Sequence, residues 1–228
     1  MLTLHHLEHS RSQRILWLLE ELGVEYAIEK YSRDTETSLA PKELEAVHPL
    51  GKSPVITDGD MTVAESGAII EYLVAKYGDG RLVPPDDTPE RMAYTYWLHY
   101  AEGTFAPLML LSVVMMKIEN APVPFFIKPV TRRIVQMVRS GYLGDTTKRN
   151  LDFMELSLDA STWFCGDELT AADMQMSFAV EAAAARANLG ENYPNLAAFL
   201  DRIHALPAYR IALEKGGPYE LMGASTKK

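Results

Sequence analysis

The sequence has 228 residues, of which 47% are apolar and 23% charged, a composition typical of a soluble globular protein with one large domain or two ordinary ones. Its net charge of -9 argues against nucleic acid as a partner, and no apolar run reaches the roughly 18 residues that a membrane span needs. A single cysteine excludes an intrachain disulfide, and the first residues lack the basic and apolar regions of a signal peptide. We therefore expect a cytoplasmic protein with no nucleic-acid partner and no membrane partner.

The first eighty residues alternate strand and helix patterns. Apolar and polar residues alternate where strands are expected, and apolar residues recur every three or four positions where helices are expected. The predicted elements are, in order, strand 2–7, helix 10–22, strand 24–31, helix 38–47, hairpin 53–66 and helix 66–78. Gly23 is expected to end the first helix. The order βαβαββα predicts a four-stranded sheet with helices packed on it.

A segment rich in proline and glycine, 79–89, has almost no periodicity and predicts a linker. Helical spacing then continues to near the end of the chain, beginning with a helix at 90–105 that Pro107 should kink or interrupt. The inner face of this helix is predicted to carry Tyr94, Trp97, Leu98, Ala101 and Phe105. Further helices are predicted at 130–143, 147–164, 171–190 and 195–213, and the tail 223–228 is expected to be disordered. We expect an N-terminal domain at 1–80, a linker at 81–88 and an all-helical domain at 89–228.

Two short motifs of the N-terminal domain have the composition of a ligand site. In "PLGKSPVI" (49–56), a cis bond before Pro54 would turn the backbone N–H and C=O of Ser53 outward, although about 95% of X–Pro bonds are trans. In "AESGAII" (64–70), Ser66 is a candidate helix cap at an anion-attracting N-terminus, and Glu65 could accept hydrogen bonds from an ammonium group. The pair suits the α-amino-acid end of a ligand. The alternative is purely structural, with Ser66 as a cap and Glu65 complementing the helix dipole.

In order and spacing, four motifs resemble those of the cytosolic glutathione S-transferase family. They are "HSRSQRILWLLEELGVEY", "HPLGKSPVI", "AESGAIIEYL" and "LTAADMQMSF", and the resemblance covers nearly the whole chain. It implies a thioredoxin-like N-terminal domain that binds glutathione, and an all-helical C-terminal domain, a helical bundle, that forms the electrophile pocket. It also implies that Pro54 is cis, that Ser53 pairs with the cysteinyl backbone of glutathione and that Lys52 meets the glycyl carboxylate. Glu65 and Ser66 would hold the γ-glutamyl end.

The N-terminal domain has no cysteine, so a hydroxyl is the candidate activator of the glutathione thiol, as in the serine-type branch of the family. A thiol with a pKa of about 8.5 is only a few per cent ionised at pH 7, and lowering that pKa by about two units takes about 2.7 kcal/mol. Ser10 is the favoured catalytic residue, because it matches a capping box with Gln13 and lies at the strand–helix junction. Ser12 is the alternative and is otherwise a candidate for binding glutathione.

The resemblance also suggests residues of the helical domain. Glu102 lies on the helix that forms the dimer interface in the family, from which it would reach the γ-glutamyl amino group bound by the partner subunit. The candidates for the electrophile pocket are Leu7, His9, Phe105 and Met109.

Other features have structural explanations. Thr170 and Asp173 match a capping box and resemble the folding signature of the family's helical domain. His5, His6 and His9 lack the cysteine or carboxylate partners of a metal site, so no metal is expected. Cys165 lies among bulky apolar residues and is expected to be a buried, inert thiol.

The predicted function is that of a homodimeric glutathione transferase, active in detoxification, that ionises glutathione for attack on small electrophilic or hydrophobic substrates. Glutathione is the expected co-substrate, and the sequence does not identify the electrophile. Two alternatives remain open. One is a glutathione-dependent peroxidase or disulfide reductase that uses the same site, and the other is a non-enzymatic binding module on the transferase fold.

Overall fold

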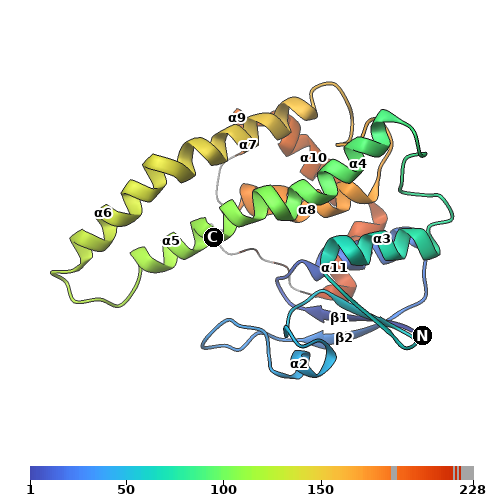
Figure 1. Ribbon diagram of the computed structural model, residues 1–228, viewed down its shortest axis with the longest axis horizontal. Coiled ribbons are helices and arrows are strands. Elements are labelled where there is room, and N and C mark those ends of the chain that lie inside the picture. The colour runs from blue at the N-terminus through green and yellow to red at the C-terminus, as the bar shows by residue number, and fades with distance from the viewer. Residues whose placement is uncertain (186–188, 218, 220, 222–228) are drawn as a thin grey trace.

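The computed structural model describes residues 1–185, 189–217, 219 and 221. On one side of the molecule lies a four-stranded sheet in the order β2-β1-β3-β4 (Figure 1). Its strands are β1 (Leu2–Leu7), β2 (Ala27–Tyr31), β3 (Val55–Asp58) and β4 (Met61–Ala64). β1 and β2 are parallel, and β3 is antiparallel to both β1 and β4. The predicted βαβαββα order and the predicted fold class are confirmed.

α1 (Ser12–Leu22) is the central helix of the N-terminal part. It contacts β1, α3 (Ser66–Tyr77), α8 (Ala171–Ala184) and α11 (Pro207–Gly216), so it lies between the sheet and the C-terminal helices. Its apolar side chains are almost completely buried as a result. Gly23 ends the helix at a φ of 69°, a left-handed conformation that glycine adopts without steric cost.

β2 and α2 are also shorter than predicted. β2 begins at Ala27, three residues later than expected. α2 (Glu43–Val47) starts after Pro41, because a proline disfavours helical geometry in the residue before it. Segment 78–88, between α3 and α4, contains no helix or strand. The division into domains 1–80 and 89–228 with linker 81–88 stays a prediction.

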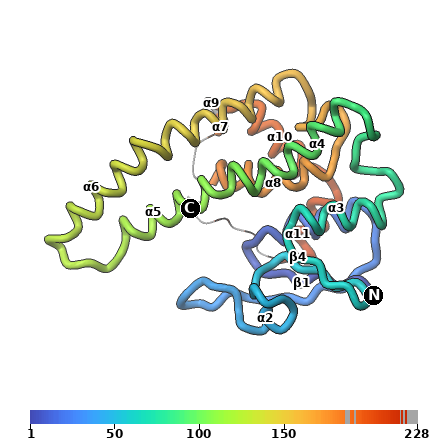
Figure 2. The backbone as a smooth tube through the Cα atoms, viewed as in Figure 1, coloured from blue at the N-terminus to red at the C-terminus, as the bar shows by residue number. Residues whose placement is uncertain are grey.

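The regular elements of the C-terminal part are all helices in its described residues. Its elements are α4 (Pro89–Tyr100), the π turn η1 (Ala101–Phe105), α5 (Ala106–Glu119), α6 (Lys128–Val138), the π turn η2 (Arg139–Leu143), α7 (Gly144–Ser157), α8, α9 (Leu189–Asn192), α10 (Pro194–Ala205) and α11. Figures 1 and 2 show α5 and α6 as a long hairpin that extends away from the rest of the molecule. α8 packs against α4, α1 and α10 and so forms the centre of this part.

The predicted inner face of the first C-terminal helix is confirmed, since all five of its residues are at most 5% exposed. Pro107 does not end this helix, which continues from Pro89 to Glu119. Instead the backbone widens into η1 just before the proline, where Ala106 donates to the carbonyl of Ala101. A wider turn accommodates a residue that has no N–H to donate and whose ring crowds the preceding turn.

By length and mean hydropathy the helix Pro89–Glu119 could cross a membrane. This criterion is weak for a single helix, because core helices of soluble proteins meet it too. The absence of a membrane partner stays a prediction.

The prediction of a helix over 147–164 is wrong at its end. α7 stops at Ser157, and the chain then turns through a short bridge between Trp163 and Gly166. The predicted helix 195–213 is divided at Pro207, whose ring excludes the preceding residue from helical geometry. The tail 223–228 lies outside the described residues.

The structural roles predicted around α8 are confirmed. Thr170 and Asp173 form the capping box, and Asp173 also accepts the backbone N–H of Phe164 at 2.9 Å. Cys165 is buried, and burial raises the pKa of its thiol to about 12. It is therefore uncharged and inert near neutral pH.

Candidate active site

Two cavities adjoin where the β1–α1 turn meets the start of β3, the N-terminus of α3 and the π turn η1. The first has a volume of about 150 Å³ and is lined by Arg11, His48, Leu50, Lys52, Ser53, Pro54, Ala64, Glu65, Ser66 and Glu102. The second has a volume of about 240 Å³, and its walls come mainly from the β1–α1 turn, η1, α5 and α8. Arg11 and Glu102 line both. A larger cavity, about 650 Å³ between α5 and α7, contains only Met109 of the predicted site residues.

Five of the predicted glutathione-binding residues meet in the first cavity, namely Lys52, Ser53, Pro54, Glu65 and Ser66. The Ser53–Pro54 bond is cis, as predicted. The hydroxyl of Ser53 donates to the carbonyl of His5 at 2.8 Å and accepts the backbone N–H of Leu7 at 3.2 Å. The side chain is thus fixed to β1, while the backbone N–H and C=O of Ser53 have no hydrogen-bond partner among the described residues.

The N-terminus of α3 differs from the prediction by one residue. Glu65, not Ser66, occupies the cap position, and it makes no side-chain capping bond. Its φ of 71° is strained for a residue with a side chain, a feature that clusters at ligand sites. Ser66 is the first helical residue and is only 4% exposed, yet it lines the cavity. The first turn of a 12-residue helix therefore opens on the cavity, where its N–H groups attract an anion.

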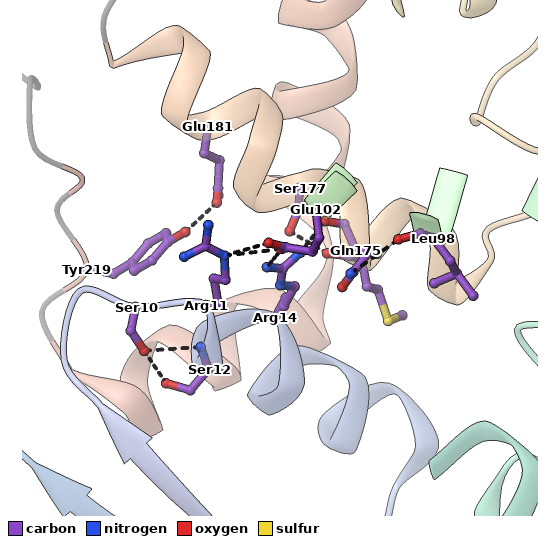
Figure 3. Close-up of polar contacts among 11 residues, drawn as sticks. Ser10, Arg11, Ser12, Arg14, Leu98, Glu102, Gln175, Ser177, Glu181 and Tyr219 are labelled. Carbon is purple, nitrogen blue, oxygen red and sulfur yellow. Dashed lines mark hydrogen bonds and ion pairs between the residues drawn. The ribbon is translucent and has the colours of Figure 1, made fainter. Parts of the chain in front are cut away.

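Neither serine of the β1–α1 turn lines either of these two cavities, although Ser10 was predicted to be catalytic and Ser12 to bind glutathione. Ser10 is 6% exposed and Ser12 fully buried. The Ser10 hydroxyl donates to the carbonyl of Leu7 at 2.7 Å and accepts the N–H of Ser12 at 3.2 Å, and the two hydroxyls are 2.8 Å apart (Figure 3). Ser12 Oγ also lies 2.8 Å from Nδ1 of His6, a ring whose pKa burial lowers to about 4. Both hydroxyl protons are therefore used inside the protein.

The predicted capping box of Ser10 and Gln13 is wrong. α1 begins at Ser12 with Arg11 in the cap position. The side chain of Gln13 is 2% exposed and turns toward α11, where a Cβ on Gly216 would lie 2.8 Å from its Oε1. Starting the helix later moves Arg11, rather than a hydroxyl, to the cavity.

Arg11 lies where the two cavities meet. Its Nε donates to both carboxylate oxygens of Glu102 at 3.1 and 3.0 Å, and its guanidinium lies 4.8 Å from the ring centroid of Phe178. In Figure 3 its two terminal nitrogens point away from Glu102, toward the side of Glu181 and Tyr219. No hydrogen bond from these nitrogens occurs within the described part of the chain. Arg11 thus presents a cation with unused donors to both cavities.

Glu102 is paired twice within its own chain, with Arg11 and with the buried Arg14. Burial alone would raise the pKa of Glu102, but the two guanidinium groups outweigh it and lower the pKa. Arg14 also donates to the backbone carbonyl of Gln175, which links α1 to α8. The cross-subunit role of Glu102 stays a prediction, and its carboxylate already has these partners without a second subunit.

Of the residues predicted for the electrophile pocket, His9 and Met109 line the second cavity. Leu7 and Phe105 do not, because they are packed in the core at 3% and 0% exposure. Most of the other walls are apolar, from Ala106, Leu110, Val113, Phe178, Ala179 and Ala182, and Arg33 supplies a further cation. No group of three histidine, cysteine or acidic side chains in the described residues is arranged to hold a metal ion.

The sequence prediction named none of Arg11, Arg33 and His48 as site residues. Arg11 could have been recognised as one of only seven cations in the first eighty residues, at a helix start. Arg33 lies outside every motif quoted above, and His48 begins the motif "HPLGKSPVI" without a pattern that assigns it a role of its own.

Comparison with known proteins identifies the family. Residues 1–75 match the family model "Glutathione S-transferase, N-terminal domain", and residues 142–207 match "Glutathione S-transferase, C-terminal domain". Over 215 residues the chain is 38% identical to "Glutathione S-transferase 3" of Schizosaccharomyces pombe, a match that covers 94% of this chain and 88% of that protein. The chain belongs to the glutathione S-transferase family.

Two further relatives agree with this assignment. "Glutathione S-transferase 1" of Saccharomyces cerevisiae is 30% identical over 223 residues, covering 94% of this transferase and 95% of the yeast protein. The crystal structure of a glutathione S-transferase from Actinobacillus pleuropneumoniae is 37% identical, with a TM-score of 0.78 over 95% of this chain and 93% of that one. The predicted family and enzyme class are confirmed: the chain is a glutathione transferase. No comparison favours a peroxidase, a disulfide reductase or a non-enzymatic module.

Proposed function

We propose that this transferase binds glutathione in the first cavity and conjugates it to a small electrophilic or hydrophobic substrate held in the second. The observation that carries the proposal is the match of charge in the first cavity. Glutathione has two carboxylates, one ammonium group and a thiol that reacts as an anion. The cavity offers Lys52, the N-terminus of α3 and Arg11 for the anions, and Glu65 for the cation.

Each end of glutathione has a counterpart in this arrangement. Lys52 meets the glycyl carboxylate, and the free backbone N–H and C=O of Ser53 pair with the cysteinyl residue. The γ-glutamyl carboxylate accepts from Ser66 and the first turn of α3, while Glu65 accepts from the ammonium group. In this proposal the thiol lies toward Arg11, which lines both cavities.

Arg11, rather than Ser10 or Ser12, stabilises the thiolate in this proposal. The serine hydroxyls are hydrogen-bonded inside the protein, whereas the terminal nitrogens of Arg11 make no hydrogen bond to the described residues. A guanidinium group favours the ionised thiol by charge and by hydrogen bonding, which lowers the thiol pKa. The serines instead position Arg11, because their bonds to Leu7 and His6 fix the β1–α1 turn.

The electrophile lies among the apolar walls of the second cavity, next to His9 and Met109. With an aryl halide, the thiolate sulfur bonds to the ring carbon and the halide leaves with the bonding electron pair. The thiol proton passes to water, so no oxidant or reductant is needed.

The same proposal includes a cytoplasmic homodimer with a role in detoxification. An exposed apolar patch on the outer faces of α4 and α7 supports the dimer. It consists of Met92 at 71%, Tyr96 at 47%, Phe153 at 41% and Leu156 at 70% exposure. Patches of this kind mark protein interfaces. The single cysteine of the chain suits a reducing compartment.

The test combines binding and product analysis. Calorimetry should show glutathione binding to the unmodified protein, and turnover should be highest with an aryl halide, compared with an organic hydroperoxide and a mixed disulfide of glutathione. Turnover mainly with the hydroperoxide or disulfide would contradict the conjugation proposal, and failure to bind glutathione would contradict the assignment of the first cavity.

A further inference from the structure

Arg33 is a cation at the edge of the second cavity whose hydrogen bonds end on neutral groups. Its side chain donates to three backbone carbonyls, those of Glu8 at 3.2 Å, Ser38 at 3.0 Å and His9 at 3.2 Å. These bonds use one N–H on each of the three guanidinium nitrogens. A guanidinium has five N–H donors, so one remains on each terminal nitrogen, without a partner in the described residues.

The charges around this cavity leave a positive excess. Among the described residues that line it, Arg11 and Arg33 are cations and Glu102 is the one acidic residue. Glu102 is already shared between Arg11 and Arg14. Glu8 lies near Arg33 and accepts its backbone N–H at 2.7 Å. The pKa of Arg33 is nevertheless lowered, because burial outweighs the attraction of Glu8, so a further anion would be favourable there.

The remaining walls fit an apolar body. Met109, Leu110, Val113 and Phe178 face the same space of about 240 Å³. A ligand that fills it would bury apolar surface while an anionic group reaches the guanidinium at the edge. Arginine suits a carboxylate especially, because its donors match the two oxygens.

We propose that the preferred electrophiles of this transferase are carboxylates: small apolar molecules whose carboxylate is bound by Arg33 while the electrophilic carbon faces the glutathione thiolate beside Arg11. This inference rests on the proposed function, because it names the substrate class of the same site. For a chloronitrobenzoate, the C–S bond forms at the ring carbon that carries chlorine. Chloride leaves with the bonding pair, and the carboxylate takes no part in the reaction.

The test compares 4-chloro-3-nitrobenzoate with 4-chloro-3-nitrobenzamide, its neutral isostere, in the full-length enzyme. Arg33→Gln should lower kcat/KM for the benzoate at least about tenfold more than for the benzamide, which is the size expected for one charge-assisted hydrogen-bonded pair. Arg33→Lys should recover part of the loss. Each variant is assayed with both substrates, and its benzoate-to-benzamide ratio of kcat/KM is compared with that of the wild type. The different intrinsic reactivities of the two substrates therefore cancel.

Lys30→Gln is the matched control, since it removes one exposed cation from β2, a side chain that lines neither cavity. It should change the benzoate-to-benzamide ratio by less than about twofold. Equal losses of kcat/KM for both substrates in Arg33→Gln would mean that Arg33 only stabilises the backbone around Glu8, His9 and Ser38. That result would overturn the inference.

Two other outcomes separate the sources of failure. If Arg33→Gln raises the KM for glutathione with the benzamide as strongly as the KM for the benzoate, Arg33 binds a carboxylate of glutathione instead, and the inference is wrong. If the wild type binds no glutathione and conjugates neither substrate, the proposed function itself fails, and the inference fails with it.

Discussion

Arg11→Gln tests the central feature of the proposed site, a cation beside the thiol of glutathione. Two unit charges about 4 Å apart attract by about 4 kcal/mol at an effective dielectric constant of about 20. The effect on the thiolate should be smaller, because Glu102 shares this charge and the Arg11 side chain is 37% exposed. We expect the loss of Arg11 to destabilise the bound thiolate, relative to the thiol, by about 1.4 to 2.7 kcal/mol. This raises the pKa of the bound thiol by about one to two units.

The assay is an ultraviolet titration of the thiolate in the binary complex with glutathione, together with the pH dependence of kcat for an aryl halide. In Arg11→Gln the inflection of both curves should move to higher pH. At pH 7 kcat should fall about tenfold if chemistry limits turnover, and the difference should shrink at a pH above the new pKa. Affinity for glutathione should change less, since the contacts at its two ends persist.

Ser10→Ala and Lys42→Gln are the controls. Ser10→Ala removes a donor to the carbonyl of Leu7 and an acceptor for the N–H of Ser12, so it should lower the free energy of unfolding by about 1–2 kcal/mol. Ser12 keeps its own contacts with Leu7 and His6 and so still holds the turn, and the thiol pKa should therefore change much less than in Arg11→Gln. Lys42→Gln removes an exposed cation that lines neither cavity and should change neither property. A pKa that moves in Ser10→Ala but not in Arg11→Gln would refute this reasoning and restore the serine as activator.

Three further predictions follow from other parts of the molecule. Glu65→Gln should weaken glutathione binding by about 2 kcal/mol in calorimetry and barely affect an analogue without the γ-glutamyl amino group, whereas equal losses would place Glu65 elsewhere. Met92→Glu combined with Leu156→Glu should convert a dimer to a monomer in sedimentation velocity, and a persisting dimer would exclude this patch as the interface. Acidification below about pH 6 should change the stability of His6→Gln and Asp173→Asn in opposite directions relative to the wild type.

The first cavity was predictable because its residues lie at the ends of regular elements. Pro54 precedes β3, and Glu65 and Ser66 begin α3, so the sheet topology alone brings the two motifs together. Short motifs with their own local geometry, a proline before a strand and a polar pair at a helix start, therefore carry most of the information about the first cavity.

The second cavity was predicted less well because its contacts are not local. Arg11 and Glu102 are separated by 91 positions, and no periodic pattern links them. Phe105 and Met109 lie four positions apart, yet Phe105 is fully buried in the core while Met109 also lines the cavity. A shift of the α1 start to Ser12 exchanged a serine for Arg11 at the site. Each of these details depends on packing between distant elements.

The pH prediction depends on two buried groups with opposite protonation preferences. Burial raises the pKa of Asp173 to about 6, despite hydrogen bonds from Phe164 and Thr170 that lower it. Between about pH 4 and 6 the native state therefore keeps a proton that the unfolded chain releases, and this group stabilises the native state as the pH falls. Burial lowers the pKa of His6 from 6.5 to about 4. Here the unfolded chain takes up a proton that the native state does not, so His6 destabilises the native state as the pH falls.

Each shift of about two units corresponds to about 3 kcal/mol, so the two effects nearly cancel in the wild type between pH 6.5 and 4. His6→Gln keeps a hydrogen-bonding side chain near Ser12 but cannot protonate, so on acidification it should gain about 3 kcal/mol relative to the wild type. Asp173→Asn should be less stable at every pH, because its amide cannot accept all the bonds of the carboxylate, and should lose about another 3 kcal/mol on acidification. Urea unfolding at several pH values between 7 and 4 measures the difference in free energy of unfolding between each variant and the wild type. The contributions of all other titrating groups cancel in these differences. If the free energy of unfolding of both variants changes with pH in parallel with that of the wild type, neither His6 nor Asp173 has the shifted pKa assigned to it.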